Sequence, residues 1–121
     1  MSQESTIRTK SKAFAIRIVR MSRHLQEERH EYVLSRQVLR SGTSIGANVR
    51  ESKNAQSTAD FISKLEIALK ESDETEYWLE ILHETSYLGD DEFDSMITDN
   101  KELTAMLTSI IKTTKTNNNK H

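Results

Sequence analysis

Residues 59–89 read ADFISKLEIALKESDETEYWLEILHETSYLG, and this stretch decides the fold class. Its apolar residues recur three or four positions apart, which is the spacing of one face of an α-helix. Half of the residues between them are acidic, so we expect the opposite face to meet solvent. The pattern predicts one long helix over residues 59–88, ended by Gly89 in a left-handed conformation. Its core stripe comprises Phe61, Leu65, Ala68 or Leu69, Ser72, Thr75, Leu79 and Leu82.

The same spacing predicts three further helices, which begin at residue 9 or 11, at residue 32 and at residue 91. They end at residues 25, 52 and 115, and we expect residues 1–8 and 116–121 to fray. Polar connections separate the helices; Ser57 or Thr58 is expected to cap the third helix, and Asp90 or Asp91 the fourth. The expected core positions are Phe14, Ile18, Met21 and Leu25, widened by Ile16 and Val19; Leu34, Val38, Ile45 and Val49; and Phe93, Met96 or Ile97, Leu103, Leu107, Ile110 and Ile111.

Composition agrees with an all-α chain. The 121 residues contain no proline and only three glycines, so there are few positions at which helices must break. Four amphipathic helices joined by short connections bury their stripes most simply as an antiparallel up-and-down four-helix bundle. We therefore expect a single domain over residues 1–121, with its core over residues 9–115 and its two ends on the same side.

The sequence offers no recognisable catalytic or metal site. It has no cysteine, and its four histidines do not form a pair at the spacing of a helical metal site. The acidic residues of the third helix could supply a general acid and base, but a solvated acidic face is the favoured interpretation. We expect a non-enzymatic protein without cofactor, metal or small-molecule substrate. With no apolar run of membrane-spanning length, we also expect it to be cytoplasmic.

Charge is distributed unevenly along the chain. Residues 1–53 contain 11 Lys/Arg against 5 Asp/Glu, whereas residues 54–121 contain 6 against 14. The favoured interpretation is attraction between helices of the two halves, within a bundle or between subunits; the alternative is a nucleic-acid surface on the basic half. The candidate partner or nucleic-acid surface comprises Lys10, Lys12, Arg17, Arg20, Arg23, Arg36, Arg40, Arg50 and Lys53.

A stripe of small polar residues runs beside the apolar stripe of the second helix. It consists of Gln37, Ser41, Ser44, Asn48 and either Glu51 or Ser52. Gly42 and Gly46 lie among them, so we expect a neighbouring helix to approach closely here. Buried polar groups need partners, which favours a structural network with a facing helix. The alternative is that the stripe belongs to a partner-binding surface together with the nearby arginines.

Two motifs resemble those of a known family. Residues 44–51, SIGANVRE, resemble the S-I-x-A-N-x-x-E signature of bacterial four-helix bundle proteins first noticed as reading frames within intervening sequences of large-subunit rRNA genes. Residues 60–71, DFISKLEIALKE, with Glu74-Thr75 and Tyr77-Trp78-Leu79, resemble a second stretch of one branch, and Leu88-Gly89 stands at its glycine turn. The candidate polar network of these motifs comprises Ser44, Asn48, Glu51, Glu71, Glu74, Tyr77 and Trp78.

The resemblance implies an antiparallel four-helix bundle that assembles into a ring-shaped homo-oligomer, with five subunits as the state associated with relatives, and it does not imply an enzyme. A more distant branch, the accessory variability determinant of diversity-generating retroelements, binds nucleic acid and a reverse transcriptase through a strongly basic surface. The present chain differs from that branch by its net charge of -2.

Our leading hypothesis is an oligomeric interaction protein that presents a charged surface to an RNA, DNA or protein partner. The alternative is direct RNA or DNA binding by the basic first and second helices, in association with an rRNA intervening sequence or a reverse transcriptase. For Tyr77 and Trp78, burial or subunit contact is favoured over stacking on bases, because their neighbours are acidic.

Overall fold

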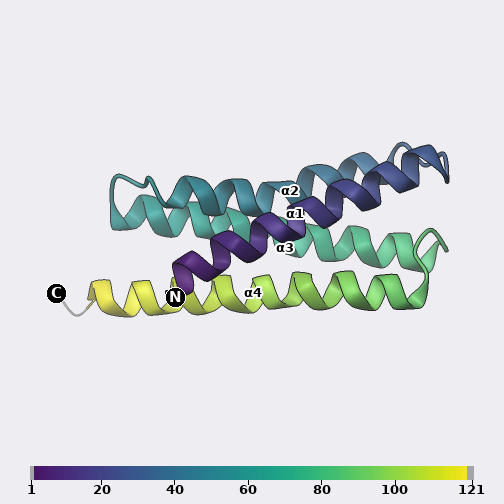
Figure 1. The fold of residues 1–121 in the computed structure, drawn as a ribbon. Coiled ribbons are helices and arrows are strands. Elements are labelled where there is room, and N and C mark those ends of the chain that lie inside the picture. Colours follow the sequence, from purple (N-terminus) through teal and green to yellow (C-terminus); the bar gives the residue numbers. More distant parts are fainter. Residues whose placement is uncertain (1, 120–121) are drawn as a thin grey trace.

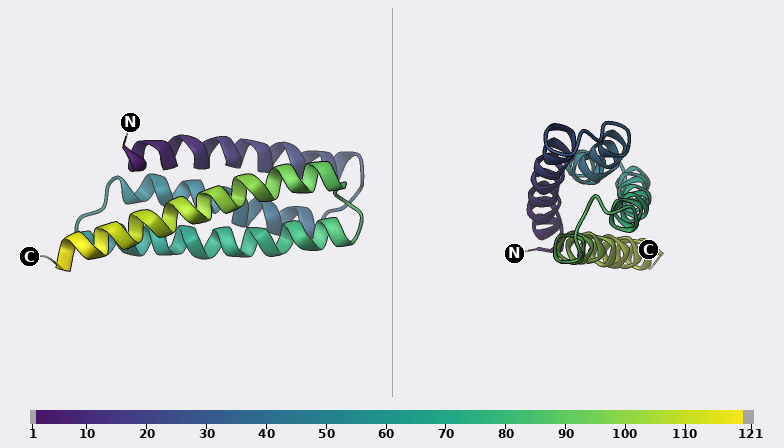
Figure 2. Two further views of the ribbon diagram at one scale, coloured as in Figure 1. Left: turned by 90° about the horizontal axis from the view of Figure 1, so that it is seen from below. Right: turned by 90° about the vertical axis from the view of Figure 1, so that its right-hand side faces the viewer.

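The computed structural model describes residues 2–119, and within them it contains four α-helices and no strand. The helices are α1 (Gln3–Glu27), α2 (Leu34–Ser52), α3 (Thr58–Glu84) and α4 (Asp90–Asn119). They run alternately up and down, so that the start of α1 and the end of α4 lie at the same end of the molecule (Figure 1). Seen end-on, the helices surround a common centre in chain order (Figure 2). The predicted all-α up-and-down bundle is confirmed.

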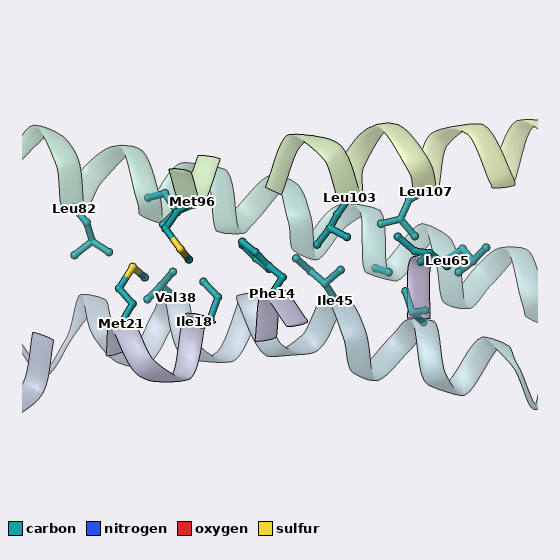
Figure 3. Close-up of a cluster of buried hydrophobic side chains, with 14 of the residues drawn as sticks. Phe14, Ile18, Met21, Val38, Ile45, Leu65, Leu82, Met96, Leu103 and Leu107 are labelled. Atoms are coloured by element: carbon teal, nitrogen blue, oxygen red, sulfur yellow. The ribbon is translucent and has the colours of Figure 1, made fainter. Parts of the chain in front are cut away.

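One hydrophobic core receives side chains from all four helices (Figure 3). Phe14 and Ile18 of α1 meet Val38 and Ile45 of α2, while α3 and α4 contribute from the opposite side. The residues buried from the predicted stripes are Phe14, Ile18, Met21, Leu25, Val38, Ile45, Val49, Leu65, Ala68, Ser72, Thr75, Leu79, Leu82, Met96, Leu103, Leu107, Ile110 and Ile111. These stripes are the reason that the chain folds as a bundle, since each apolar face is hidden only by the other three.

Ile16 and Val19 do not widen the core stripe, and that prediction is wrong. Their side chains are 44% and 37% exposed. At 3.6 residues per turn, Ile16 lies about 160° around the helix from Phe14, which points into the core. Both residues therefore stand on the outer side of α1.

The ends of the chain are more ordered than the sequence predicted. Helix α1 begins at Gln3, and the hydroxyl of Ser2 caps it by accepting a hydrogen bond from the Ser5 amide at 3.1 Å. Ile7 is buried because it continues the core stripe by one turn beyond Ser11. Helix α4 extends to Asn119. The expectation of fraying is thus wrong for residues 3–8 and 116–119, while Met1, Lys120 and His121 lie outside the described residues.

The connection between α1 and α2 contains a capping residue that the sequence analysis missed. The buried Glu31 carboxylate accepts hydrogen bonds from the amides of Val33, Leu34 and Ser35, at 3.3, 3.1 and 2.7 Å. Val33 directly precedes α2, and Leu34 and Ser35 are its first two residues, so these amides have no partner within the helix. Helix α2 consequently begins at Leu34, two residues later than predicted.

Gly89 is not the left-handed terminator of α3. The helix ends at Glu84, and the residue with positive φ is Ser86, at 68°. The amides of Ser86 and Tyr87 bond to the carbonyls of His83 and Leu82, which is the Schellman arrangement at a helix end. The chain turns early because Leu88 must enter the core, where it is 2% exposed.

The caps at the starts of α3 and α4 differ in outcome. Ser57 caps α3 as predicted, since its hydroxyl accepts a hydrogen bond from the Asp60 amide at 3.0 Å. Helix α4 already includes Asp90, so neither Asp90 nor Asp91 is its cap. Both carboxylates lie in its first turn instead, where negative charge is favourable.

Helices α1 and α2 approach each other closely at the two glycines of α2. A Cβ added to Gly42 would lie 2.8 Å from Ile18 Cγ1, and one added to Gly46 would lie 3.2 Å from the Ser11 carbonyl oxygen. Both distances are shorter than ordinary carbon contacts. The prediction of a close helix approach at these small residues therefore agrees with the structure.

The polar stripe of α2 forms less of a network than predicted. Of its members, Ser41 reaches a facing helix, with its hydroxyl 2.9 Å from the Thr75 hydroxyl of α3. Ser44 and Asn48 bond to backbone carbonyls one turn earlier in their own helix, and Glu51 is exposed. A polar layer between α3 and α4 adds Ser72, whose carbonyl accepts a hydrogen bond from the buried Asn100 amide at 2.9 Å. The Ser72 hydroxyl also lies 3.0 Å from the Thr104 hydroxyl of α4, so this layer supplies two hydrogen bonds between facing helices and the stripe supplies one.

Candidate functional site

A groove with a volume of about 660 Å³ lies between α1 and α2 on the outer surface of the bundle. Small residues such as Ala15, Gly46 and Ala47 form part of its lining. Four of its ten lining residues are basic and none is acidic; all ten are Arg8, Thr9, Lys12, Ala15, Thr43, Gly46, Ala47, Arg50, Lys53 and Asn54. We call this feature the basic groove.

Helix geometry explains how the cations reach the basic groove. Arg8 and Lys12 are four residues apart on α1, and Arg50 and Lys53 are three apart at the end of α2, so each pair shares one face of its helix. Gly46 lets the two helices approach, and having no side chain, it leaves the groove open. The two pairs of cations therefore stand on opposite walls of one hollow.

A second, shallower hollow of about 380 Å³ adjoins the basic groove along α1. The two share Lys12 and Ala15, so they form a continuous surface. Ile16 and Val19 are exposed in its middle, and Arg20 and Arg23 lie beyond them. The cations of this surface thus fall into two groups: Arg8, Lys12, Arg50 and Lys53 form the groove group, and Arg20 and Arg23 form the distal group.

Five of the nine predicted surface cations belong to this surface, namely Lys12, Arg20, Arg23, Arg50 and Lys53. None of the five makes an ion pair within residues 2–119. Arg36 is also exposed on α2, but it lines neither hollow. The surface is therefore positively charged without compensation from the rest of the described chain.

The other three predicted cations are paired with acidic residues of the second half. Lys10 Nζ lies 2.9 Å from a Glu102 carboxylate oxygen, and Arg17 lies 2.6 Å from Asp99. Arg40 contacts Glu71 at 2.8 Å and also Glu74. For these three, the interpretation that opposite charges attract between helices of the bundle agrees with the structure.

Arg8 lines the basic groove but was missed by sequence reasoning. The predicted first helix began at residue 9 or 11, which placed Arg8 in a frayed end. Ile7 carried the signal that could have found it, since it precedes Ser11 and Phe14 at steps of four and three. Extending the helix to Ile7 would have put Arg8 one turn before Lys12.

Arg40, Glu71, Glu74 and Trp78 form a cluster between α2 and α3. Trp78 Nε1 donates a hydrogen bond to Glu74 at 3.0 Å, and this bond, with that from Arg40, lowers the pKa of Glu74 below its ordinary value. The hydrogen bond to Glu74 likewise raises the pKa of Arg40. Tyr77 packs edge-on against Trp78 and is 56% exposed. Glu74 is thus held as an anion beside the guanidinium of Arg40, which does not suit a general acid, and Glu71 contacts the same guanidinium.

The predicted polar network divides into two parts. Glu71, Glu74 and Trp78 come together around Arg40, and Tyr77 adjoins them. Ser44 and Asn48 remain on α2 with backbone partners, and Glu51 is exposed with no bond to the cluster. Across residues 2–119, no three His, Asp or Glu side chains are grouped so as to hold a metal ion. No helix in that span is long and apolar enough to cross a membrane.

Comparison with known proteins gives a family match over most of the chain. The family model described as 23S rRNA-intervening sequence protein matches residues 3–109. The chain shares 51% sequence identity with a protein of unknown function from the S23 ribosomal protein family of Bacteroides thetaiotaomicron VPI-5482, whose crystal structure is known. Its TM-score is 0.91, and the match covers 92% of this chain and 99% of that one. No curated protein matches the chain.

Proposed function

The chain belongs to the 23S rRNA-intervening sequence protein family, and from this premise we propose that it is a non-enzymatic protein that binds the phosphate backbone of a nucleic acid in the basic groove. One observation carries the proposal: four cations line a hollow that has no acidic residue. Phosphate contacts from lysine and arginine supply most of the affinity of proteins for nucleic acids that they bind regardless of sequence. Ionised carboxylates repel phosphate, so their absence matters as much as the cations.

The distribution of ion pairs supports this function. Cations that face α3 or α4 are matched by acids, whereas those of the basic groove are free to meet an external anion. Thr9, Thr43 and Asn54 add hydroxyl and amide groups to the lining, and such groups also bond to phosphate oxygens. The carboxylates of Glu71 and Glu74 do not reach this site, since Arg40 holds them between α2 and α3 and none of the three lines the basic groove.

Fluorescence anisotropy with a labelled RNA hairpin tests the proposal. We expect affinity to fall linearly with salt on logarithmic axes, with a slope of about −0.9 for each phosphate contact. Arg50→Gln should weaken binding and reduce that slope by about one contact, and Arg50→Gln with Lys53→Gln by about two. Arg36→Gln is the matched control, because Arg36 is an exposed arginine of the same helix outside the groove. Undetectable binding even at low salt would refute the function.

Self-assembly is a second candidate property, and exposed apolar side chains outside the groove favour it. Val33 is 68% exposed and Tyr77 56%, and Tyr32 and Ile67 are also exposed. Such side chains are frequent in protein interfaces. We propose a homo-oligomeric ring, with five subunits as the state implied by the resemblance. A ring would present several basic grooves to one nucleic acid and so raise its apparent affinity. Light scattering at micromolar concentration tests this, and a monomer there would contradict it.

A further inference from the structure

We infer that the surface formed by the basic groove and the adjoining hollow selects double-helical nucleic acid over single strands. The inference rests on the proposed function, and it adds the class of ligand. Two features of the described surface carry it: the gap between its two groups of cations, and the absence of aromatic side chains from its lining.

The cations form a stripe along α1 that is interrupted in its middle. Lys12 and Arg20 are eight residues apart, which corresponds to about 12 Å along the helix. Ile16 and Val19 fill the interval and are exposed. Arg17 also falls in this interval by number, but it turns toward α4 and pairs with Asp99. The stripe therefore presents two positive ends with an uncharged middle.

A double helix fits this pattern better than a single strand does. Its two backbones are separated by a groove, which for the major groove of B-form DNA is about 12 Å wide. Phosphates of one strand can then contact the groove group and those of the other strand the distal group. The major groove between the two strands would lie over Ile16 and Val19. A single strand following the same path would place consecutive phosphates over these apolar side chains, where no cation meets them.

The lining also lacks what single-strand binding requires. Proteins that hold single strands without sequence preference stack the bases on aromatic side chains. None of the residues that line either hollow is aromatic. The aromatic pair of α3, exposed Tyr77 and half-buried Trp78, lies outside both linings and beside acidic residues. This surface thus offers no stacking for unpaired bases, whereas a duplex presents two backbones to its cations.

Competition binding at one salt concentration tests the inference with duplex RNA, duplex DNA and a single-stranded uridine oligomer of equal length. We expect at least one duplex to bind about tenfold more tightly than the single strand, because the surface offers no stacking to compensate a missing backbone. The two duplexes distinguish A-form from B-form geometry. Equal or tighter binding of the uridine oligomer would overturn the inference while leaving the proposed function intact. Binding of none of the three at low salt would instead overturn the proposed function.

A variant of the distal group separates duplex selection from general electrostatic attraction. Arg20→Gln with Arg23→Gln should weaken duplex binding several-fold and leave single-strand binding nearly unchanged, since one strand fits within the groove group alone. The matched control is Arg36→Gln with Lys101→Gln, which removes the same charge from exposed positions outside both hollows. If the distal variant weakened both ligands equally, the two groups would be acting as one attractive field, and the inference would be wrong.

Discussion

The lysine and arginine residues of α1 have different surroundings on the side that faces α4 and on the side that faces α2. Toward α4, Lys10 and Arg17 are paired with Glu102 and Asp99. Toward α2, Arg8 and Lys12 face Arg50 and Lys53 across the basic groove. The role of a cation in this chain is therefore decided by the helix opposite it. Because α4 places Asp99 and Glu102 opposite α1, whereas α2 places no acidic residue in the groove, one side of α1 helps to close the bundle and the other remains available to a partner.

Packing also differs between the inward and the outward face of α1. The inward side of α1 lies against α2 so closely that Gly42 has no room for a side chain beside Ile18. The outward side carries Val19, which is 37% exposed in the hollow next to the basic groove. If this contrast is correct, substitutions on the inward side should affect stability and those on the outward side should affect binding.

The largest expected effect comes from Ile18→Ala. Ile18 is fully buried where α1 meets α2, and its truncation should lower the free energy of unfolding by about 2–5 kcal/mol. Val19→Ala, one residue along on the outward side, should change that free energy by less than about 0.5 kcal/mol. Urea denaturation followed by circular dichroism measures both. Similar losses in the two variants would mean that the outward side is buried, for instance in an oligomer.

Gly42→Ala should have an intermediate effect. The new methyl group would overlap Ile18, whose atoms lie 2.8 to 3.0 Å from the added Cβ, and overpacking of this kind costs about 1–3 kcal/mol. The gain in helix propensity of about 1 kcal/mol offsets part of it, so we expect a net loss of roughly 1 kcal/mol. Thermal unfolding measures the change. Gly89→Ala is the control, because nothing lies within 4 Å of its added Cβ and its φ is not positive. A stabilised Gly42→Ala variant would show that α1 and α2 can separate at no cost.

The sequence predicted the parts of this structure that depend on local periodicity. Stripes at helical spacing determine which faces are buried, and Phe14, Leu65 and Leu107 are all in the core as expected. Prediction from the sequence was wrong where a tertiary contact outweighed the local sequence pattern. Ser86 instead of Gly89 adopts positive φ because Leu88 has to return to the core. Glu31 looked like one more charged connection residue, and only the folded chain shows its carboxylate at the first turn of α2.

The candidate site was predictable in composition and not in arrangement. The excess of cations in residues 1–53 was compatible with attraction between helices and with a basic surface, and helical spacing cannot tell which cations find acids on a neighbouring helix. Arg17 and Arg20 are three residues apart, yet one pairs with Asp99 and the other lines an open hollow. That distinction depends on which helix lies beside α1, and the sequence alone does not fix it.

The smallest expected effect concerns the cluster in which Arg40 of α2 pairs with Glu71 and Glu74 of α3. The pKa of Glu74 is lowered in the folded protein by hydrogen bonds from Trp78 and Arg40, relative to its ordinary value of 4.5. A carboxyl group with a lowered folded-state pKa stabilises the fold above its unfolded-state pKa, and that stabilisation is lost as pH falls through the folded-state value. Glu74→Gln should therefore reduce stability at neutral pH by less than about 1 kcal/mol, as for other partly exposed ion pairs. The difference from the wild type should shrink as the pH is lowered below about 4.5.

Chemical denaturation at a series of pH values measures this difference, and Glu80→Gln provides the control. Glu80 is an exposed carboxylate of the same helix without an ion pair among residues 2–119, so its substitution should leave the pH profile unchanged. Nucleic-acid binding by Glu74→Gln should also stay close to that of the wild type, because Arg40 lies outside the basic groove. If the variant instead bound more tightly, Arg40 released from Glu74 would have joined the binding surface. Cations that are paired within the bundle could then also bind nucleic acid once their partner is removed, and the contrast between paired and unpaired cations would no longer hold.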